Sequence, residues 1–235
     1  IFVGARKRRN GAASAARRDA PNGKSSRRLA AADREQQILA EAVRFFAEVG
    51  FNGHTRELAQ RLHITQPLLY RYFPTKQDLI ERVFKEIFFT RIDPQWSQLI
   101  ADRTRPLEDR LIEFYQHYAR ATYSYEWIRI YMFSALMGND INRRYIKIVE
   151  EKILKPICKE IRHHCGLGSG DAVTEAELEH VWVMHGGIFY YAVRKYVYHS
   201  RVGDDLTAIV RRAVRGVLAG ATASFTASAL KGAKE

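Results

Sequence analysis

The residues best suited to recognition chemistry lie together in one short segment, residues 54–76. The segment holds a glutamine beside a proline, two tyrosines spaced two apart, and cationic side chains near both ends. A glutamine amide can bind the edge of adenine at two points, while tyrosine, arginine and lysine bind phosphate oxygens. These residue types favour non-covalent recognition of nucleic acid. The sequence has no nucleophile elbow, phosphate loop or zinc-hydrolase motif, so enzymatic activity is not expected.

Two short helices are expected to position these side chains. Apolar residues at helical spacing predict one helix over residues 55–62 and a second over residues 65–72, joined by a tight turn around His63. Thr65 is suited to cap the second helix, and Pro67 falls in its first turn, where proline is tolerated.

The second helix has two distinct faces. Leu69 and Phe73 lie four residues apart and are expected to anchor it to a core. The outer face that remains comprises Gln66, Pro67, Leu68, Tyr70, Arg71 and Tyr72. A short helix with a polar and aromatic outer face suits insertion into a DNA major groove.

This segment resembles the TetR family of transcriptional regulators. The resemblance covers about residues 34–80 and rests on the order apolar-Thr-x-x-x-Leu-Tyr-x-Tyr-Phe-Pro-x-Lys, followed by an amphipathic helix. It implies an all-α fold with an N-terminal three-helix helix-turn-helix domain and a C-terminal helical domain for ligand binding and dimerisation. It also implies a repressor that binds palindromic operator DNA as a homodimer and is released by a small-molecule effector.

The resemblance also implies roles for individual residues. Gln66 would read a base, and Pro67 and Leu68 would touch base edges or thymine methyl groups. Tyr70 and Tyr72 would contact phosphate or sugar. Arg56 would reach a phosphate or base edge, and Lys76 a phosphate at the N-terminus of the next helix. The full expected DNA-binding set is Arg56, Thr65, Gln66, Pro67, Leu68, Tyr70, Arg71, Tyr72 and Lys76. For Arg71, a solvated surface position without DNA contact is an equally good interpretation.

Two positions depart from the family pattern. His63 stands in the turn where the family often has glycine, and a positive φ costs a non-glycine residue some stability. His54 stands where a serine or threonine cap is usual, so the first short helix is expected to be less firmly capped.

Composition and spacing divide the chain into three parts. Residues 1–32 are predicted to be a disordered basic tail, 33–92 the helix-turn-helix domain and 93–235 the ligand-binding and dimerisation domain. The first helix is expected to run from residue 33 to 49 with Asp33 as its cap, and Thr75 with Asp78 to form a capping box for a helix over 75–90. Longer helices are expected at 107–123, 126–138, 141–165, 174–199 and 205–230.

Positive charge is concentrated at the N-terminus. The net charge is +12, and residues 1–33 hold nine basic and two acidic side chains, which is +7 of that total. Such an excess favours a polyanionic partner, although a solvated leader and a DNA-touching arm both fit it. The two cysteines, seven residues apart on one helical face, are too distant for a disulfide, which suits a cytoplasmic protein. No signal peptide or membrane span is expected.

The C-terminal half is less specific. Aromatic residues crowd positions 114–137 and could line an apolar pocket or fill a core. On the family's precedent we expect ligand contacts from Tyr118, Trp127, Tyr131, Met137 and His185. Gly186 and Gly187 interrupt a predicted helix at a cost of about 2 kcal/mol relative to alanine, which close helix contact or a kink beside a pocket would offset.

The last two helices are expected to pair with their copies in a dimer, although a role in the intramolecular core is also compatible with their small residues. His163, His164 and Cys165 match no compact metal site, so neither metal nor cofactor is expected. Three alternatives stay open: a regulator controlled by protein contacts or by no ligand, an enzyme on a helical scaffold, and a nucleoid protein with weak sequence preference.

Overall fold

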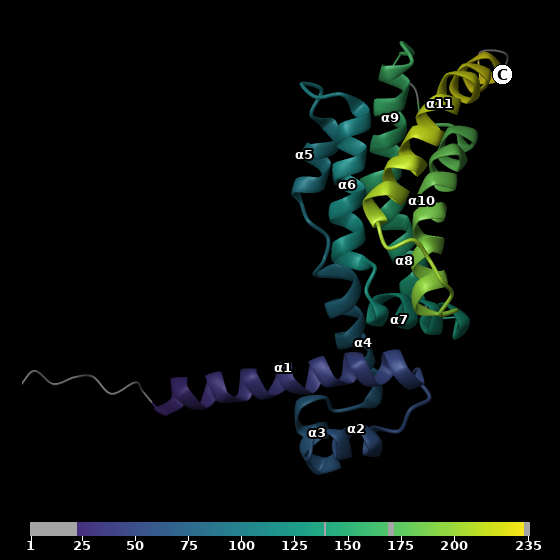
Figure 1. The fold of residues 1–235 in the computed structure, drawn as a ribbon. Coiled ribbons are helices and arrows are strands. Elements are labelled where there is room, and N and C mark those ends of the chain that lie inside the picture. Colours follow the sequence, from purple (N-terminus) through teal and green to yellow (C-terminus); the bar gives the residue numbers. More distant parts are fainter. Residues whose placement is uncertain (1–22, 139, 169–171, 233–235) are drawn as a thin grey trace, which may run out of the picture. The chain divides into compact units, whose positions relative to one another are not determined.

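The computed structural model describes residues 23–138, 140–168 and 172–232, and within these ranges every regular element is a helix (Figure 1). The α-helices are α1 (Gly23–Val49), α2 (Thr55–Arg61), α3 (Gln66–Tyr72), α4 (Lys76–Phe84), α5 (Gln95–Ala101), α6 (Leu107–Thr122), α7 (Tyr125–Leu136), α8 (Asp140–Val149), α9 (Lys155–His164), α10 (Glu175–Tyr196) and α11 (Leu206–Gly232). Two π-helical segments, η1 (Lys85–Phe89) and η2 (Glu150–Leu154), extend α4 and α8. The all-α prediction is confirmed.

The chain divides into two units, with the boundary between Gln37 and Ile38. The second unit holds the helix-turn-helix segment together with the later helices. The boundary expected near residue 92 therefore stays a prediction. No helix in the described ranges is long and apolar enough to cross a membrane.

Helix α1 begins earlier than its capping signal suggested. It starts at Gly23, so Asp33 lies inside the helix and the prediction of a cap there is wrong. Residues 23–32, expected to be disordered, are helical, and residues 1–22 of the predicted tail lie outside the described residues. The physical reason is propensity: Leu29 and three alanines precede Asp33, and extending an existing helix through such residues costs little.

The buried face of α1 is a stripe of apolar residues at helical spacing. Ile38, Leu39, Ala42, Phe45 and Phe46 are all fully buried. The helix ends at Val49, and Gly50 follows it with a φ of +75°, in the left-handed region that favours glycine.

The turn between α2 and α3 has the strained residue expected from sequence. His63 adopts a φ of +52°, and its own N–H donates to the carbonyl of Gln60 over 3.0 Å. His54 precedes α2 without a side-chain capping bond, as expected. Thr65 caps α3 by accepting a hydrogen bond from the backbone N–H of Leu68 over 3.3 Å, also as predicted.

Two long helices predicted from periodicity are interrupted. The helix expected over 75–90 starts with the predicted Thr75–Asp78 capping box but changes to the π-helical segment η1 at Lys85. The helix expected over 141–165 divides into α8, η2 and α9. Pro156, near the start of α9, has no N–H to donate, and η2 absorbs the resulting break in the α-helical ladder.

One helix was missed. The segment 95–101, for which no helix was expected, forms α5 with Trp96 and Ile100 buried. The carboxylate of Asp93 accepts a hydrogen bond from the N–H of Gln95 over 2.8 Å and so starts the helix. A helix of this length carries too few turns to give a clear periodic signal.

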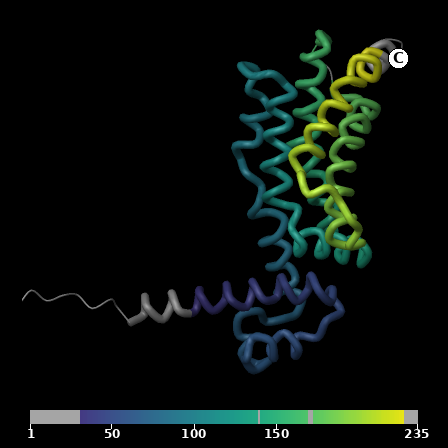
Figure 2. The backbone as a smooth tube through the Cα atoms, in the orientation of Figure 1, coloured from purple at the N-terminus to yellow at the C-terminus, as the bar shows by residue number. Residues whose placement is uncertain are grey.

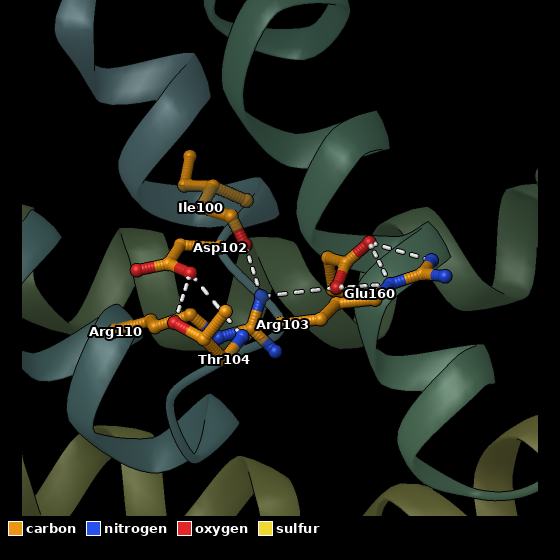
Figure 3. Close-up of polar contacts among 6 residues, drawn as sticks. All are labelled: Ile100, Asp102, Arg103, Thr104, Arg110 and Glu160. Carbon is orange, nitrogen blue, oxygen red and sulfur yellow. Dashed lines mark hydrogen bonds and ion pairs between the residues drawn. The ribbon is translucent and has the colours of Figure 1, made fainter.

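The later helices pack side by side, with α11 lying along both α10 and α6 (Figure 2). A partly buried ion cluster, in which Glu160 and Arg110 are buried and Arg103 is exposed, ties α9 to the start of α6 (Figure 3). Glu160 accepts hydrogen bonds from Arg103 over 2.9 and 3.1 Å and from Arg110 over 3.0 Å, and Arg110 also donates to the carbonyl of Ile100. Burial alone would raise the pKa of Glu160, but the hydrogen bonds from the two arginines outweigh it and hold that pKa below its ordinary value.

Candidate nucleic-acid interface and aromatic cavity

Helix α3 is firmly anchored on one side and open on the other. Leu69 is 1% exposed and Phe73 is 4% exposed, so both predicted anchors are buried. Among the sequence-predicted DNA-contact residues, Arg56, Thr65, Pro67 and Arg71 are exposed, while Gln66, Leu68, Tyr70, Tyr72 and Lys76 are half-buried. All nine retain accessible surface, although Tyr72 also packs against the core.

Thr55, which sequence reasoning did not select, connects two of these residues. It is the first residue of α2 and is buried. The Gln66 side-chain amide donates to Thr55 Oγ1 over 3.0 Å, and the hydroxyl groups of Thr55 and Tyr70 are hydrogen-bonded over 2.9 Å. A hydroxyl in the first turn of one helix thus holds two side chains of the next. The only sequence signal for this role is that a polar residue stands at a position of α2 that faces the apolar core.

Arg56 and Lys76 each occupy the first turn of a helix. Arg56 follows Thr55 in α2, and Lys76 is the first residue of α4, immediately after the Thr75 cap. Phosphate oxygens are favoured at helix N-termini because backbone N–H groups and the helix dipole both attract negative charge. At the N-terminus of α4, the carboxylate of Asp78 accepts hydrogen bonds from the N–H and the hydroxyl of Thr75. The Lys76 ammonium is the positively charged side chain that α4 presents to a phosphate there.

An aromatic cavity of about 200 Å³ lies among α6, α7, α8 and α10. Its lining residues are Tyr118, Tyr123, Trp127, Tyr131, Tyr145, Ile146, Val149, Trp182, His185, Gly186 and Phe189. Four of the five sequence-predicted ligand residues are among them. Met137 is not: it is 55% exposed, because α7 ends at Leu136 and the chain turns at Gly138 with a φ of +67°. Met137 therefore does not line this cavity, and its role as a ligand contact stays a prediction.

The glycine pair of α10 is explained only in part. A side chain at either Gly186 or Gly187 would meet no other atom within 4 Å, so close helix contact does not account for them. Gly186 borders the cavity, in agreement with the second explanation offered from sequence. Gly187 lies on an exposed face of α10.

Polar atoms around the cavity are few and uncharged. The hydroxyls of Tyr118 and Tyr145 are hydrogen-bonded over 2.9 Å, and Tyr115 reaches Nδ1 of His185 over 3.4 Å. Burial lowers the pKa of His185 to about 4, so this imidazole is neutral at physiological pH. The indole Nε1 of Trp127 and the hydroxyl of Tyr123 are buried and have no hydrogen-bond partner in the part of the chain that the structure describes.

Aromatic rings connect this cavity to the buried face of α1. Ring centroids follow one another from Phe46 to Phe51 at 5.3 Å, to Phe84 at 5.1 Å, to Phe88 at 5.9 Å and to Trp127 at 5.4 Å. Phe84 ends α4, and Phe88 lies in η1. The η1 segment, which extends α4, is thus packed through Phe88 against Trp127 in the wall of the cavity.

Helix α7 provides a second connection to α1. The Arg129 guanidinium donates to the carbonyls of Ala47 and, over 3.1 Å, of Glu48, both in the last turn of α1. The Phe133 ring lies 3.2 Å from the position that a Cβ would take at Gly50. Because Trp127 and Arg129 are two residues apart on α7, the cavity wall and the α1 contact share one rigid helix.

These features define the class: a helix-turn-helix regulator of transcription that binds DNA. Residues 38–83 match the family described as bacterial regulatory proteins of the tetR family. This segment thus matches the DNA-binding domain of that family, and the resemblance recognised from residues 54–76 is confirmed.

A solved structure from Mesorhizobium loti MAFF303099, of a protein assigned to the TetR family of transcriptional regulators, has a similar fold. The two chains are 14% identical with a TM-score of 0.54, and the match covers 80% of this chain and 96% of that chain. No curated protein sequence matches this chain. The structural likeness thus supports the fold, while the family match carries the class.

Proposed function

We propose that this regulator is a repressor that binds a palindromic operator as a homodimer and leaves it when a small molecule occupies the aromatic cavity. The observation that carries the DNA-binding part is α3, a short helix whose inner face is fixed by Leu69 and Phe73 and whose outer face stays accessible. A helix presented in this way can enter a major groove without refolding.

In this proposal Gln66 reads a base. One of its amide hydrogens is donated to Thr55, which leaves the amide oxygen and the second hydrogen for the paired edge of adenine. Pro67 and Leu68 supply apolar contact to thymine methyl groups. Arg56, Thr65, Tyr70, Arg71, Tyr72 and Lys76 are assigned to the sugar-phosphate backbone or neighbouring base edges.

Thr55 acts in the same proposal as a positioning residue. An amide side chain held at one point has fewer rotamers to lose when it meets the base edge. The same hydroxyl orients Tyr70, so a single buried group sets the geometry of two contacts.

Dimerisation is assigned to α10 and α11. Val183 is 73% exposed, and it lies with Gly187 and Tyr190 along one exposed face of α10. On α11, Gly216 is also exposed with no atom near its missing side chain. Small residues permit close helix approach, and a two-fold axis here would place two α3 helices on successive major grooves about 34–36 Å apart.

Ligand release is assigned to the aromatic cavity. A larger, open hollow of about 740 Å³ between α4, η1 and α8 is lined mainly by charged side chains, whereas small-molecule sites are mostly apolar with few polar groups. A ligand that shifts Trp127 would act on α4 through Phe88 and on α1 through Arg129. A coupling free energy of about 1–3 kcal/mol is typical of such control. Cytoplasmic action suits the two free thiols, Cys158 and Cys165.

The test is selection of bound sequences from a pool of random DNA duplexes. The affinity of the protein for the selected sequence and the mass of the complex are then measured. We expect a palindrome with half-sites about one helical turn apart, bound by an even number of chains. A Pro67→Arg variant, which alters only the exposed face of α3, should lose the selected sequence. Recovery of unrelated sequences with equal affinity would instead favour a nucleoid protein, and a stoichiometry of one chain per site would contradict the dimer.

A further inference from the structure

The walls of the aromatic cavity contain no formally charged side chain. Its eleven lining residues include neither Asp, Glu, Lys nor Arg. The only titratable group that commonly charges near neutrality, the His185 imidazole, is held neutral by burial, which lowers its pKa to about 4. Transfer of a charged ligand into such surroundings removes its hydration without an ionic partner. The walls therefore favour a neutral ligand.

Two buried donors next to the cavity lack a partner. Trp127 is 1% exposed and Tyr123 is 7% exposed, and neither the indole Nε1 nor the tyrosine hydroxyl makes a hydrogen bond within the described residues. An indole N–H can only donate, and a buried unpaired donor is costly. A ligand with an acceptor oxygen relieves that cost, whereas a quaternary ammonium ion, which aromatic rings also attract, has no atom that accepts.

The size and walls of the cavity narrow the ligand further. A dry apolar cavity of about 150 Å³ is enough to bind benzene, and this one is about 200 Å³. Trp127 and Tyr131 lie with their ring planes 10° apart, and Phe189 presents its ring at a steep angle to both. Such walls suit one flat aromatic ring with a short substituent.

We infer that the cavity binds neutral, single-ring aromatic compounds that carry a hydrogen-bond acceptor, such as an aryl ketone or ester, with the acceptor oxygen bonded by Trp127 or Tyr123. As an effector class this rests on the proposed function, because it takes the cavity to be the regulatory site. As a statement about binding it stands on the cavity alone.

The experiment compares four probes of similar size on the full chain: acetophenone, ethylbenzene, benzoate and benzyltrimethylammonium. Titration calorimetry gives each dissociation constant. One net hydrogen bond of about 0.5–1.5 kcal/mol corresponds to about 2- to 12-fold, so acetophenone should bind that much more tightly than ethylbenzene. Benzoate and benzyltrimethylammonium should bind more weakly than acetophenone.

Matched variants locate the donor. Tyr123→Phe and Trp127→Phe remove one donor each and keep an aromatic ring, while Tyr198→Phe removes a hydroxyl from an exposed residue outside the cavity. We expect at least one of the first two to abolish the preference for acetophenone over ethylbenzene, and Tyr198→Phe to preserve it. Thermal unfolding of each variant verifies that the fold is retained.

Several results would overturn the inference. Equal binding of acetophenone and ethylbenzene removes the acceptor requirement, tighter binding of either charged probe removes the neutral class, and no binding of any probe removes the single-ring ligand. Operator binding is measured separately, with and without acetophenone. If acetophenone binds as expected but leaves operator affinity unchanged, the ligand class stands and release by ligand is contradicted.

Discussion

Replacement of Thr55 by valine tests how the reading face of α3 is held. Valine has nearly the same shape as threonine and removes only the hydroxyl that bonds Gln66 and Tyr70. Each intramolecular hydrogen bond contributes about 0.5–1.5 kcal/mol. Because both partners are half-buried and can turn to water, the loss in folding stability should lie near the lower end, about 1 kcal/mol in total.

The effect on DNA should be selective. Without its anchor, Gln66 pays extra conformational entropy on binding adenine, about 0.5–1.5 kcal/mol for a flexible side chain. We therefore expect Thr55→Val to lower the preference for the Gln66-dependent base pair by about 2- to 12-fold. Affinity for operators already altered at that base pair should change much less.

The assay measures binding of wild type, Thr55→Val and Thr55→Ser to the selected operator and to a copy with the adenine of each half-site replaced. Serine keeps the hydroxyl, so Thr55→Ser should retain the wild-type ratio of the two affinities. A ratio that is unchanged in Thr55→Val would refute the positioning role. An equal fall in both variants would assign the effect to the methyl group, and thus to packing.

Four further predictions concern the interface and its support. Gln66→Ala should weaken binding to the preferred operator by about 1–3 kcal/mol and leave random DNA nearly unaffected; equal losses on both would exclude base reading. Lys76→Ala should weaken all sequences alike and lower the slope of log affinity against log salt by about one, and an unchanged slope would remove this residue from the phosphate contacts. Glu160→Gln should cost about 3 kcal/mol of unfolding free energy because Arg110 is left buried without its anionic partner. Since the folded-state pKa of Glu160 is lowered, its stabilising contribution is present above the ordinary carboxyl pKa and is lost as pH falls through the folded-state pKa. The variant should therefore lose less stability than wild type below about pH 4.5, and parallel pH profiles of the two proteins would contradict this. Arg129→Gln should change operator affinity without ligand by no more than a few-fold, but should reduce the change in operator affinity that a bound ligand produces. Operator titrations with and without ligand measure both effects. A full ligand response in this variant would show that coupling does not pass through the α1 carbonyls.

Local signals in the sequence determined the helix-turn-helix segment. The spacing of Leu69 and Phe73, the Thr65 cap and the Thr75–Asp78 capping box each act within a few residues, so their outcome does not depend on distant parts of the chain. The positive φ at His63 was expected from the resemblance, because the family often has glycine at this position. For these reasons the helix-turn-helix and its exposed face were predictable, and the family match confirms the segment.

Tertiary structure decided what local signals could not encode. The start of α1 and the interruption at η2 have local causes, helix propensity and Pro156, whereas the interruption at η1 depends on how a long helix fits its neighbours. Four helices form the cavity, so which residues line it depends on how those helices pack. Tyr145 and Phe189 line it although the sequence did not predict them, and Met137 does not, because α7 ends before it.

The role of Thr55 shows the same division most clearly. The sequence determined that Gln66 and Tyr70 lie on α3 and that Thr55 opens α2, each from spacing alone. Which hydroxyl meets which amide depends on the angle between the two helices. That angle is set by the burial of Leu58 and Leu69 in a common core. Contacts between residues 11 and 15 positions apart become fixed only when that core is packed, because no hydrogen bond within either helix determines them.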